Sequence, residues 1–373
     1  MEDLVLTEVH IADLHFGAFN PADQFKILYE QFYCKIANLK YDIISINGDI
    51  FDHKFMANSD AVMYAIKFID LIATDASRKG ASMVILYGTE SHDAGQLKLF
   101  YPYLEWPNLD LHIVENIQFL YLHGKKVLAI PEKYGLPEEV YRSFLFEQGL
   151  YDGVYMHGTY KGSVYGTNTP TLKSPGAPIF DMSHFIQCRG PIIAGHVHVP
   201  GCYDGHMYYC GSPLRYQFGQ EQEKGFIILL HNVTTGRYHL HFEPIISYRY
   251  DTINMDEYIG RDPKELIQRV NILQSQGIQH LRLEFSRSDE NLFNILDSYY
   301  RNNSSVTFLK PDDRKEKILQ AQIEQSSKYN DYQYIFDKSL SSEQILTRYI
   351  NQQKGYQYIT IEELRQVLNG FNT

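Results

Sequence analysis

Five short clusters of aspartate and histidine punctuate this chain, and each stands where a hydrophobic run stops. A carboxylate or imidazole at the C-terminal end of a buried strand is held by the sheet behind it and faces the crevice beyond the strand ends. One such cluster is weak evidence, because a lone histidine is more often a surface or core residue than a ligand. Five in one chain favour a common metal site. The clusters are Asp13-Leu14-His15, Gly48-Asp49-Ile50-Phe51-Asp52, Ser91-His92-Asp93, His157-Gly158 and Gly195-His196-Val197-His198.

The ligand types narrow the choice of metal. Aspartates and histidines without cysteine form a mixed oxygen and nitrogen set, which suits manganese, iron or zinc better than a closed thiolate site does. One ion needs only three or four such groups. A surplus shared through one aspartate predicts two ions about 3.5–4 Å apart, the arrangement that stabilises both the attacking and the leaving oxygen of a phosphate ester.

The N-terminal third predicts a parallel sheet. Residues 4–12, 42–47 and 83–87 have the apolar character of buried strands, and helices are expected between them at 21–39 and 59–79. Alternating strands and helices produce parallel strands joined by right-handed crossovers.

Further strands are expected along the rest of the chain. Two or three are predicted between 109 and 131, short ones at 154–156 and 192–194, and a hairpin of 225–232 and 237–242 around Thr235-Gly236. Residues 262–308 then predict the order helix, strand, helix, strand.

In this order the five clusters resemble the motifs of the calcineurin-like metallophosphoesterases, over residues 1 to about 245. Downstream, Tyr209-Cys210-Gly211-Ser212-Pro213-Leu214-Arg215 and Glu223-Lys224-Gly225-Phe226 resemble a further signature of the SbcD-type nuclease branch. That branch includes the bacterial SbcD subunit, phage recombination endonuclease subunits and the archaeal and eukaryotic meiotic-recombination nuclease.

The resemblance implies a fold and a division into domains. The expected fold is α/β, a two-sheet metallophosphoesterase sandwich flanked by helices, with a small α/β capping domain and a helical C-terminal tail. The expected domains are a nuclease domain at 1–248, a capping domain that contacts DNA at 249–309, and a linker with a helical element at 310–373. Through 315–373 the chain is expected to bind an SbcC-like, SMC-type coiled-coil ATPase, as a homodimer within a heterotetramer.

The resemblance also implies roles for individual residues. One metal is expected on Asp13, His15, Asp49 and His198, and a second on Asp49, His157, His196 and Ser91. His92 is the expected catalytic histidine beside the bridging Asp49, while Asp52 and Asp93 are expected to orient ligands. The cofactor is two Mn²⁺ ions, with Mg²⁺ or Zn²⁺ as alternatives.

One turn departs from the family pattern. Where the family has Gly-Asn-His-Asp, this chain has Gly88-Thr89-Glu90-Ser91-His92-Asp93, so Ser91 stands in place of the ligating asparagine. A serine hydroxyl is a shorter-reaching and weaker ligand than an amide oxygen. We therefore expect the second metal to be held more weakly, with Glu90 or a water on Ser91 as alternatives.

Three residues near the motifs keep open roles. His10 and His53 match no ligand position and are expected to support the site or the core, His53 also being a candidate substrate contact. Arg215 either contacts a phosphate or closes a loop.

Charge and composition limit the partners. The formal net charge of −11 argues against a general DNA-coating role, which needs clustered lysine and arginine. Double-stranded or single-stranded DNA would therefore have to be bound through local patches, the metals or a partner subunit. Without an 18-residue apolar run or a basic N-terminus, neither a membrane span nor a signal peptide is expected, and the expected location is the cytoplasm of a bacterium or phage-infected host.

These expectations favour a metal-dependent DNA exonuclease/endonuclease subunit acting in recombination, repair, replication and DNA end processing. Two alternatives stay open: a stand-alone nucleotide phosphodiesterase or phosphatase, and a catalytically weak scaffold that regulates the partner ATPase.

Overall fold

The computed structural model describes residues 3–146, 148–165, 169–170, 178–220, 222–285 and 289–309. The predicted linker and ATPase-binding element at 310–373 lie outside the described residues. The chain divides into two compact units, one of Met1–Thr252 with Val270–Leu281 and one of Ile253–Arg269 with Arg282–Thr373.

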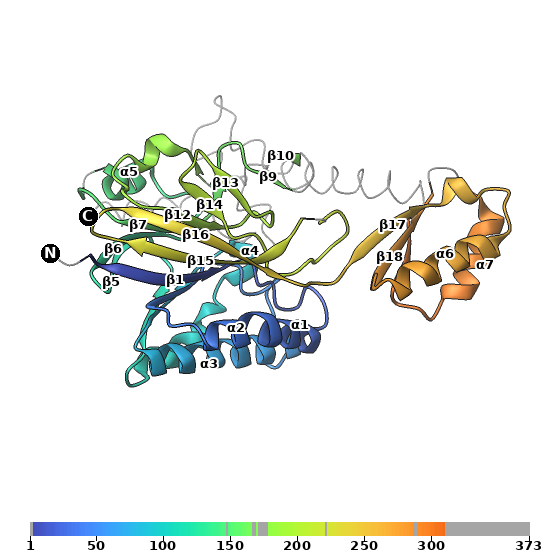
Figure 1. Ribbon diagram of the computed structural model, residues 1–373, viewed down its shortest axis with the longest axis horizontal. Coiled ribbons are helices and arrows are strands. Elements are labelled where there is room, and N and C mark those ends of the chain that lie inside the picture. The colour runs from blue at the N-terminus through green and yellow to red at the C-terminus, as the bar shows by residue number, and fades with distance from the viewer. Residues whose placement is uncertain are drawn as a thin grey trace, which may run out of the picture. The chain divides into compact units, whose positions relative to one another are not determined.

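The first large sheet contains the strands expected from the N-terminal third and the predicted hairpin. Its strands are β1 (Val5–Ile11), β2 (Ile43–Ile46), β3 (Ser82–Leu86), β4 (Asp110–Val114), β15 (Lys224–Asn232) and β16 (Arg237–Ile245). They lie in the order β16-β15-β1-β2-β3-β4. β16, β15 and β1 are seen side by side in Figure 1. β1 to β4 run parallel, and β15 pairs antiparallel with both β1 and β16.

The second large sheet is built in the same way around a parallel centre. Its strands are β5 (Gln118–Leu122), β6 (Lys125–Ile130), β7 (Gly153–His157), β12 (Ile192–Gly195), β13 (Gly201–Tyr203) and β14 (Met207–Tyr209). The order is β13-β14-β12-β7-β6-β5. The four central strands β14, β12, β7 and β6 run parallel to one another, while the outer strands β13 and β5 pair antiparallel with β14 and β6. Each large sheet thus brings the carboxyl ends of several parallel strands to one edge.

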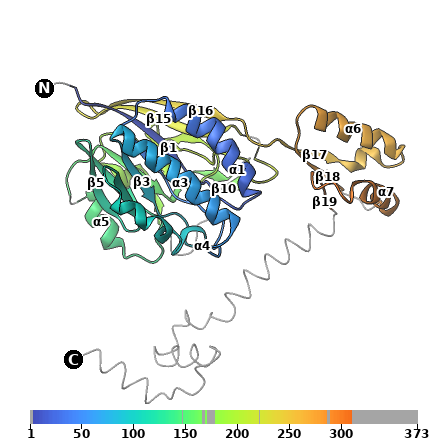
Figure 2. The same cartoon turned by 90° about the horizontal axis from the view of Figure 1, so that it is seen from below.

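Helices cover the first sheet on its outer face (Figure 2). They are α1 (Pro21–Leu28), α2 (Cys34–Ala37) and α3 (Asp60–Lys79). The single helix expected at 21–39 is interrupted by a π-helical turn at Tyr29–Tyr33. α3 begins at the cap residue Ser59, whose hydroxyl accepts from Val62 N at 3.3 Å, and it ends at Gly80 with φ 68°.

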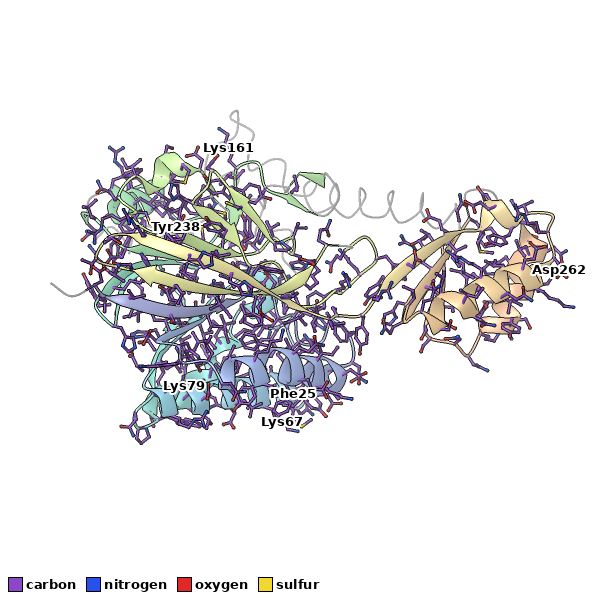
Figure 3. The ribbon with its side chains drawn as sticks, in the orientation of Figure 1. Phe25, Lys67, Lys79, Lys161, Tyr238 and Asp262 are labelled. Carbon is purple, nitrogen blue, oxygen red and sulfur yellow. The ribbon has the colours of Figure 1, made fainter. Side chains whose placement is uncertain are left out.

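Polar contacts tie the helices to one another, and apolar packing holds the layers together. Lys79, near the end of α3 (Figure 3), donates to Asp75 Oδ2 at 2.6 Å and to the carbonyl of Ile36 at 2.7 Å. One apolar core lies between these helices and the first sheet, and a second lies between the other sheet and α5 (Glu138–Phe146). A third core joins the two sheets, with Leu6 and Val84 from the first meeting Val127 and Tyr155 from the second. The predicted α/β sandwich of two sheets flanked by helices is therefore confirmed.

Several shorter strands and helical turns are also present among the described residues. β8 (Thr159–Tyr160) pairs with β11 (Ile179–Phe180), and β9 (Val164–Tyr165) pairs with β10 (Thr169–Pro170). Short helical turns are α4 (Glu90–Asp93) and the 3-10 turns Leu97–Glu105, Met182–Phe185 and Met255–Tyr258. None of the described helices is long and apolar enough to cross a membrane.

The C-terminal described segment has the expected order of helix and strand. A three-stranded sheet of order β17-β18-β19 is formed by β17 (Tyr250–Asn254), β18 (His280–Glu284) and β19 (Val306–Leu309). α6 (Pro263–Ser275) and α7 (Glu290–Tyr300) separate these strands in sequence. Asp289 caps α7 by accepting from Leu292 N at 3.0 Å.

A buried polar cluster also links the two large sheets. Glu8 on β1 accepts from Lys125 Nζ on β6 at 2.6 and 2.8 Å and from the Tyr155 hydroxyl on β7 at 2.6 Å, and all three side chains are buried. Buried charges of this kind are tolerated only when they are paired. The Glu8–Lys125 pair therefore ties one sheet to the other.

Candidate metal centre

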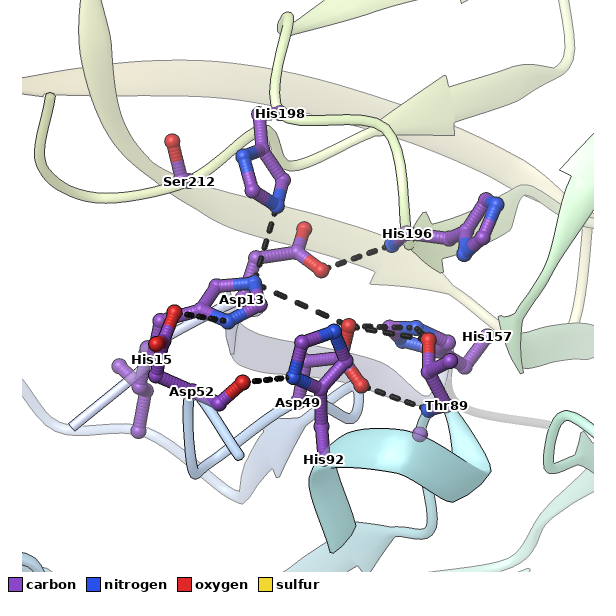
Figure 4. A network of polar contacts seen from close by, with 12 residues as sticks. Asp13, His15, Asp49, Asp52, Thr89, His92, His157, His196, His198 and Ser212 are labelled. Atoms are coloured by element: carbon purple, nitrogen blue, oxygen red, sulfur yellow. Dashed lines mark hydrogen bonds and ion pairs between the residues drawn. The ribbon is translucent and has the colours of Figure 1, made fainter. Parts of the chain in front are cut away.

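The predicted ligands come together at the strand ends of the two large sheets (Figure 4). Asp13 and His15 follow β1, Asp49 follows β2, His157 ends β7 and His196 follows β12. The backbone links the first two loops, because Asp13 N donates to the carbonyl of Gly48 and His15 N to that of Asp49, each at 3.0 Å. Polar side chains are thus held above the ends of buried strands, as the clusters in the sequence indicated.

Four of these residues have an unusual backbone conformation. Asp13, His15, Asp49 and His196 have positive φ angles of 53°, 46°, 52° and 98°. Non-glycine residues with positive φ are uncommon, and they persist where the surrounding structure holds them, often at functional sites. The loops are therefore shaped to direct these side chains into one space.

Two glycines make room for the histidines. A Cβ atom on Gly48 would lie 2.2 Å from His157 Nδ1, and one on Gly195 would lie 2.2 Å from the carbonyl oxygen of Asn47. Gly48 also has φ 88°, which disfavours any other residue. The absence of a side chain at Gly48 therefore allows the close approach of the His157 ring.

Asp13, His15 and His198 form the first group of side chains that could hold a metal. The Nε2 atoms of His15 and His198 lie 2.9 Å apart. Asp13 Oδ1 accepts from the backbone N–H of His196 at 2.9 Å, while Asp13 Oδ2 is buried and has no hydrogen-bond partner among the described residues. A buried carboxylate oxygen without a donor is costly in a protein interior, and a cation would satisfy it.

Glu132, His157 and His196 form a second such group. Glu132 Oε2 lies 3.1 Å from His196 Nδ1 and 3.6 Å from His157 Nε2. His157 Nδ1 donates to the carbonyl of Asn47 at 2.7 Å, which leaves Nε2 directed at the carboxylates. A backbone acceptor on the far ring nitrogen is the usual support of a ligating histidine.

Asp49 stands between the two groups. Its Oδ2 atom lies 3.3 Å from His157 Nε2 and 3.8 Å from His15 Nε2. Thr89 donates to it twice, from its backbone N–H at 2.6 Å to Oδ1 and from its hydroxyl at 3.1 Å to Oδ2. Asp49 also belongs to two further groups of candidate ligands, with His15 and His92 and with Asp13 and His157. Its position suits a bridge.

His92 lies at the border of the cluster, on α4. Its ring meets that of His15 edge-on, with centroids 4.8 Å apart, and its Nδ1 donates to the carbonyl of Asp52. A carbonyl oxygen only accepts, so Nδ1 carries the hydrogen and Nε2 is the nitrogen that exchanges a proton. This orientation suits proton transfer to a bound molecule.

Asp52 and Asp93 support the cluster differently. Asp93 accepts from the backbone N–H groups of Asp49, Gly88 and Ile50, at 2.9, 2.9 and 3.1 Å, and so braces the loop that carries Asp49. The carboxylate of Asp52 lies 3.6 Å from His15 Nδ1. Asp93 thus supports the loop of Asp49, Asp52 lies beside the His15 ring, and their orienting roles stay predictions.

The downstream signature holds the loop of His198. Lys224 Nζ is buried and donates to the carbonyl of His198 at 2.7 Å and to the hydroxyl of Ser212 at 2.9 Å. The Gln220 amide lies 3.3 Å from His198 Nδ1, and the Tyr216 hydroxyl donates to the carbonyl of Asp13 at 2.9 Å. The Gly211-Ser212-Pro213 and Glu223-Lys224-Gly225 motifs therefore position the first group of ligands.

Burial and charge shift the pKa values within the cluster. Burial lowers the pKa of His15 to about 4 and that of His198 well below its usual range. Burial raises the pKa of Asp13 to about 6. Burial alone would lower the pKa of His157, but the carboxylate of Asp49 raises it to about 10. Burial likewise opposes ionisation of Asp49, yet His157 holds the pKa of Asp49 well below its ordinary value.

These donors fit a metal centre. Neutral imidazoles and carboxylates without cysteine match the preferences of manganese, iron and zinc, and the orphaned Asp13 Oδ2 needs a cation. Each of the four groups places its ligand atoms within 4.8 Å of one another, and the groups share Asp13, His15, Asp49 and His157. The site thus contains His/Asp/Glu groups that could bind metal ions.

Three predicted residues have other surroundings. Ser91 is exposed on α4, directly before His92. His53 is exposed, packs in a tilted arrangement against Phe55 with ring centroids 4.0 Å apart, and pairs with Asp52 at 3.0 Å. The Arg215 side chain donates to the carbonyls of Gln220, Gln222 and Tyr248, at 2.8, 3.2 and 3.3 Å, so it closes a loop.

Four contributors to the site had not been predicted. Glu132 gave the same signal as the predicted ligands, since it follows the apolar run 127–130, but no recognisable motif surrounds it. Thr89 lies in the turn that differs from the family pattern, and no role was predicted for it. Gln220 and Tyr216 gave no local signal, because the fold alone brings them to His198 and Asp13.

Comparisons with known proteins give structural neighbours only. No family model and no curated protein matches this chain. One solved structure is 13% identical and aligns over 64% of this chain and 100% of its own, with a TM-score of 0.41. The cold-active protein-tyrosine phosphatase of the psychrophile Shewanella sp. is 14% identical over 64% of this chain and 82% of its own, with a TM-score of 0.29.

Proposed function

We propose that this chain is a metal-dependent hydrolase that cleaves the phosphodiester bonds of DNA, in the manner of the SbcD-type nucleases that its motifs resemble. One observation carries the proposal. Residues from strand ends of both large sheets converge on one buried cluster whose donors form four overlapping ligand groups. These residues are Asp13, His15, Asp49, His157, His196 and His198, with His92 beside them.

The ligand set would hold two Mn²⁺ ions, which when bound lower the pKa of water and stabilise charge on phosphate oxygens. Asp13, His15 and His198 would hold one ion and His157 and His196 the other, with Asp49 between them. His92 keeps its Nδ1 hydrogen on the carbonyl of Asp52, so protonated Nε2 would donate to the leaving oxygen. The chain thus supplies the general acid, and Asp52 orients it.

DNA is the proposed substrate because of the resemblance to the SbcD-type branch. The net charge of −11 opposes non-specific binding of DNA, so we infer that phosphates are attracted locally, at the metal centre, or through a partner subunit.

Degradation of linear double-stranded DNA with Mn²⁺ tests the proposal. The unmodified chain should degrade it, while His92→Ala and Asp49→Ala should each reduce the rate at least about 100-fold, the size of a general acid–base contribution. His239→Ala, at an exposed position on β16, is the matched control and should retain the full rate. Hydrolysis of nucleotide monoesters without cleavage of DNA would instead identify a small-molecule phosphatase.

A partner is proposed as well. We propose that residues 315–373 bind an SMC-type coiled-coil ATPase and that two copies of each chain assemble. Removal of 315–373 should abolish co-purification with such an ATPase and leave intrinsic hydrolysis intact. Inactivity with manganese, zinc and magnesium, even with the ATPase bound, would favour the scaffold alternative.

A further inference from the structure

Glu132 is a buried carboxylate inside the metal centre. It follows β6, and its backbone N–H donates to the carbonyl of Tyr87 at 3.3 Å, which ties the end of β6 to the end of β3 in the other sheet. Only 3% of the surface of Glu132 is exposed to solvent. A backbone hydrogen bond and burial therefore both restrain the position of Glu132.

The two carboxylate oxygens of Glu132 have different surroundings. Oε1 accepts from the Tyr134 hydroxyl at 3.0 Å. Oε2 faces the cluster, 3.1 Å from His196 Nδ1, 3.6 Å from His157 Nε2 and 3.2 Å from the Thr89 hydroxyl. One oxygen is thus anchored and the other is aimed at two predicted ligands of the second metal.

The negative charges of the buried carboxylates also favour a bound cation. Among the described residues, no lysine or arginine forms an ion pair with Glu132, Asp13 or Asp49. Three buried carboxylates with histidines as their nearest charged neighbours form an anionic space that divalent ions would neutralise.

We propose that Glu132 is a ligand of the second metal, together with His157, His196 and the bridging Asp49, and that it replaces the asparagine missing from the Gly88–Asp93 turn. The inference rests on the proposed metal centre. Thr89 supports this arrangement because its hydroxyl lies within hydrogen-bond distance of both Asp49 Oδ2 and Glu132 Oε2, at 3.1 and 3.2 Å. The two alternatives from the turn itself, Ser91 and Glu90, are both exposed.

This assignment changes the expected relative affinities of the two metal sites. A serine ligand implied a weakly held second ion, whereas a buried carboxylate is a charged oxygen ligand that binds divalent ions more tightly than a neutral amide does. With Glu132 the centre has three carboxylates, from Asp13, Asp49 and Glu132. We therefore expect the second ion to be held at least as tightly as the first.

Manganese binding to the full-length chain tests this assignment. Metal-free protein is titrated with Mn²⁺, free ions are counted by electron paramagnetic resonance, and bound ions are counted after desalting. The unmodified chain should bind two ions. Glu132→Gln keeps the size of the side chain but removes its charge, and should weaken one of the two by at least about tenfold, as loss of a metal-supporting group does.

A matched variant and a folding control sharpen the result. Glu90→Gln makes the same chemical change at the exposed turn and should bind two ions with unchanged affinity. Thermal unfolding with and without Mn²⁺ should show a smaller metal-induced rise of Tm for Glu132→Gln than for the unmodified chain. Glu132→Asp, which retains the charge, should restore part of that rise even where the glutamine variant folds poorly.

The outcomes separate the two proposals. Two ions of unchanged affinity in Glu132→Gln would overturn the role of Glu132 and leave the metal centre standing. An unmodified chain that binds no Mn²⁺ would overturn the metal centre, and with it the assignment. Two Glu132-dependent ions without any cleavage of DNA would support Glu132 and refute the nuclease.

Discussion

The Nε2 atoms of His15 and His198 lie 2.9 Å apart, although 183 positions separate the two residues in the chain. His15 follows a strand of the first sheet, and His198 lies in the loop after a strand of the second. Because burial lowers both pKa values, to about 4 for His15, both rings are neutral near pH 7, the form in which imidazole binds metals. The pairing therefore joins the two halves of the sandwich at their proposed catalytic edge.

Replacing Lys224 by methionine should weaken the first metal. Lys224 is buried and holds the carbonyl of His198 and the hydroxyl of Ser212, so its loss frees the loop that carries His198. We expect about a tenfold loss of Mn²⁺ affinity at one site, in the range seen when groups supporting a metal ligand are removed. Lys35→Met, which removes a half-exposed surface lysine paired with Glu243, is the control. Equal affinities for both variants in a Mn²⁺ titration would contradict this role.

Metal binding should release protons near pH 7. The pKa of His157 is raised to about 10 by Asp49, so the ring is protonated in the metal-free protein, and a metal ion must displace that proton. Metal affinity should accordingly rise with pH up to about 10, because fewer protons then compete for Nε2. Calorimetric titrations with Mn²⁺ at pH 7, in two buffers of different ionisation enthalpy, measure the release. Identical heats in both buffers would show that His157 is already neutral.

The buried Glu8–Lys125 pair should be important for stability. Lys125→Met leaves the Glu8 carboxylate buried without its cation, which costs about 3–5 kcal/mol of the free energy of unfolding. The double variant Glu8→Gln with Lys125→Met removes both charges and should recover most of that loss. Urea denaturation at pH 7 measures all three proteins, and an unchanged stability of Lys125→Met would refute the role of the pair.

The same pair should contribute to acid unfolding. Burial alone would raise the pKa of Glu8, but Lys125 lowers it well below its ordinary value of 4.5. Since the folded carboxylate resists protonation, its contribution is present above pH 4.5 and is lost as the pH falls through the lower folded value. The stability of the unmodified chain should therefore fall more steeply below pH 4.5 than that of the double variant. If the free energies of unfolding of the two proteins fell equally with pH below 4.5, the Glu8–Lys125 pair would not be the cause.

Gly48→Ala should disturb the second metal group and the fold together. The added Cβ would lie 2.2 Å from His157 Nδ1, and φ 88° disfavours alanine in any case. Gly80→Ala is a matched control, because Gly80 also has positive φ, 68°, but its Cβ would meet nothing within 4 Å. The control should cost about 1–2 kcal/mol, the backbone penalty alone, and Gly48→Ala clearly more. Equal losses on urea denaturation would show that the ring of His157 moves freely aside.

Most of the secondary structure could be predicted from local patterns. The strands at 4–12, 42–47 and 83–87 appear as β1, β2 and β3 because continuous apolar runs are typical of parallel strands buried on both faces. The helix at 59–79 was predicted to within one residue at its start, since Ser59 and Gly80 are strong end signals. The helix at 21–39 was only partly correct, because the π-helical turn at Tyr29–Tyr33 has no local signal.

The candidate site likewise contains residues that could be predicted from the sequence and residues that could not. Asp13 could be predicted to lie near Asp49, and His157 near His196, because the carboxyl ends of neighbouring parallel strands lie at one edge of a sheet. That the two pairs form one site was implied by the family resemblance. Glu132 could not, because a single carboxylate after a strand has many roles and only the approach of β6 to β3 and β7 brings it to His196. Ser91 was expected at the position of a family asparagine, but the longer turn leaves it exposed and presents Thr89 to Asp49 instead.

Local patterns predict which runs form strands, where polar residues follow them, and hence which chemistry the chain carries, because these depend on the period of apolar residues and on turn signals. How the two sheets face each other depends instead on their packing in the folded chain. That packing sets the distance between His15 and His198 and the approach of Glu132 to His157 and His196. Both arise from contacts between residues far apart in the chain, which no local pattern encodes.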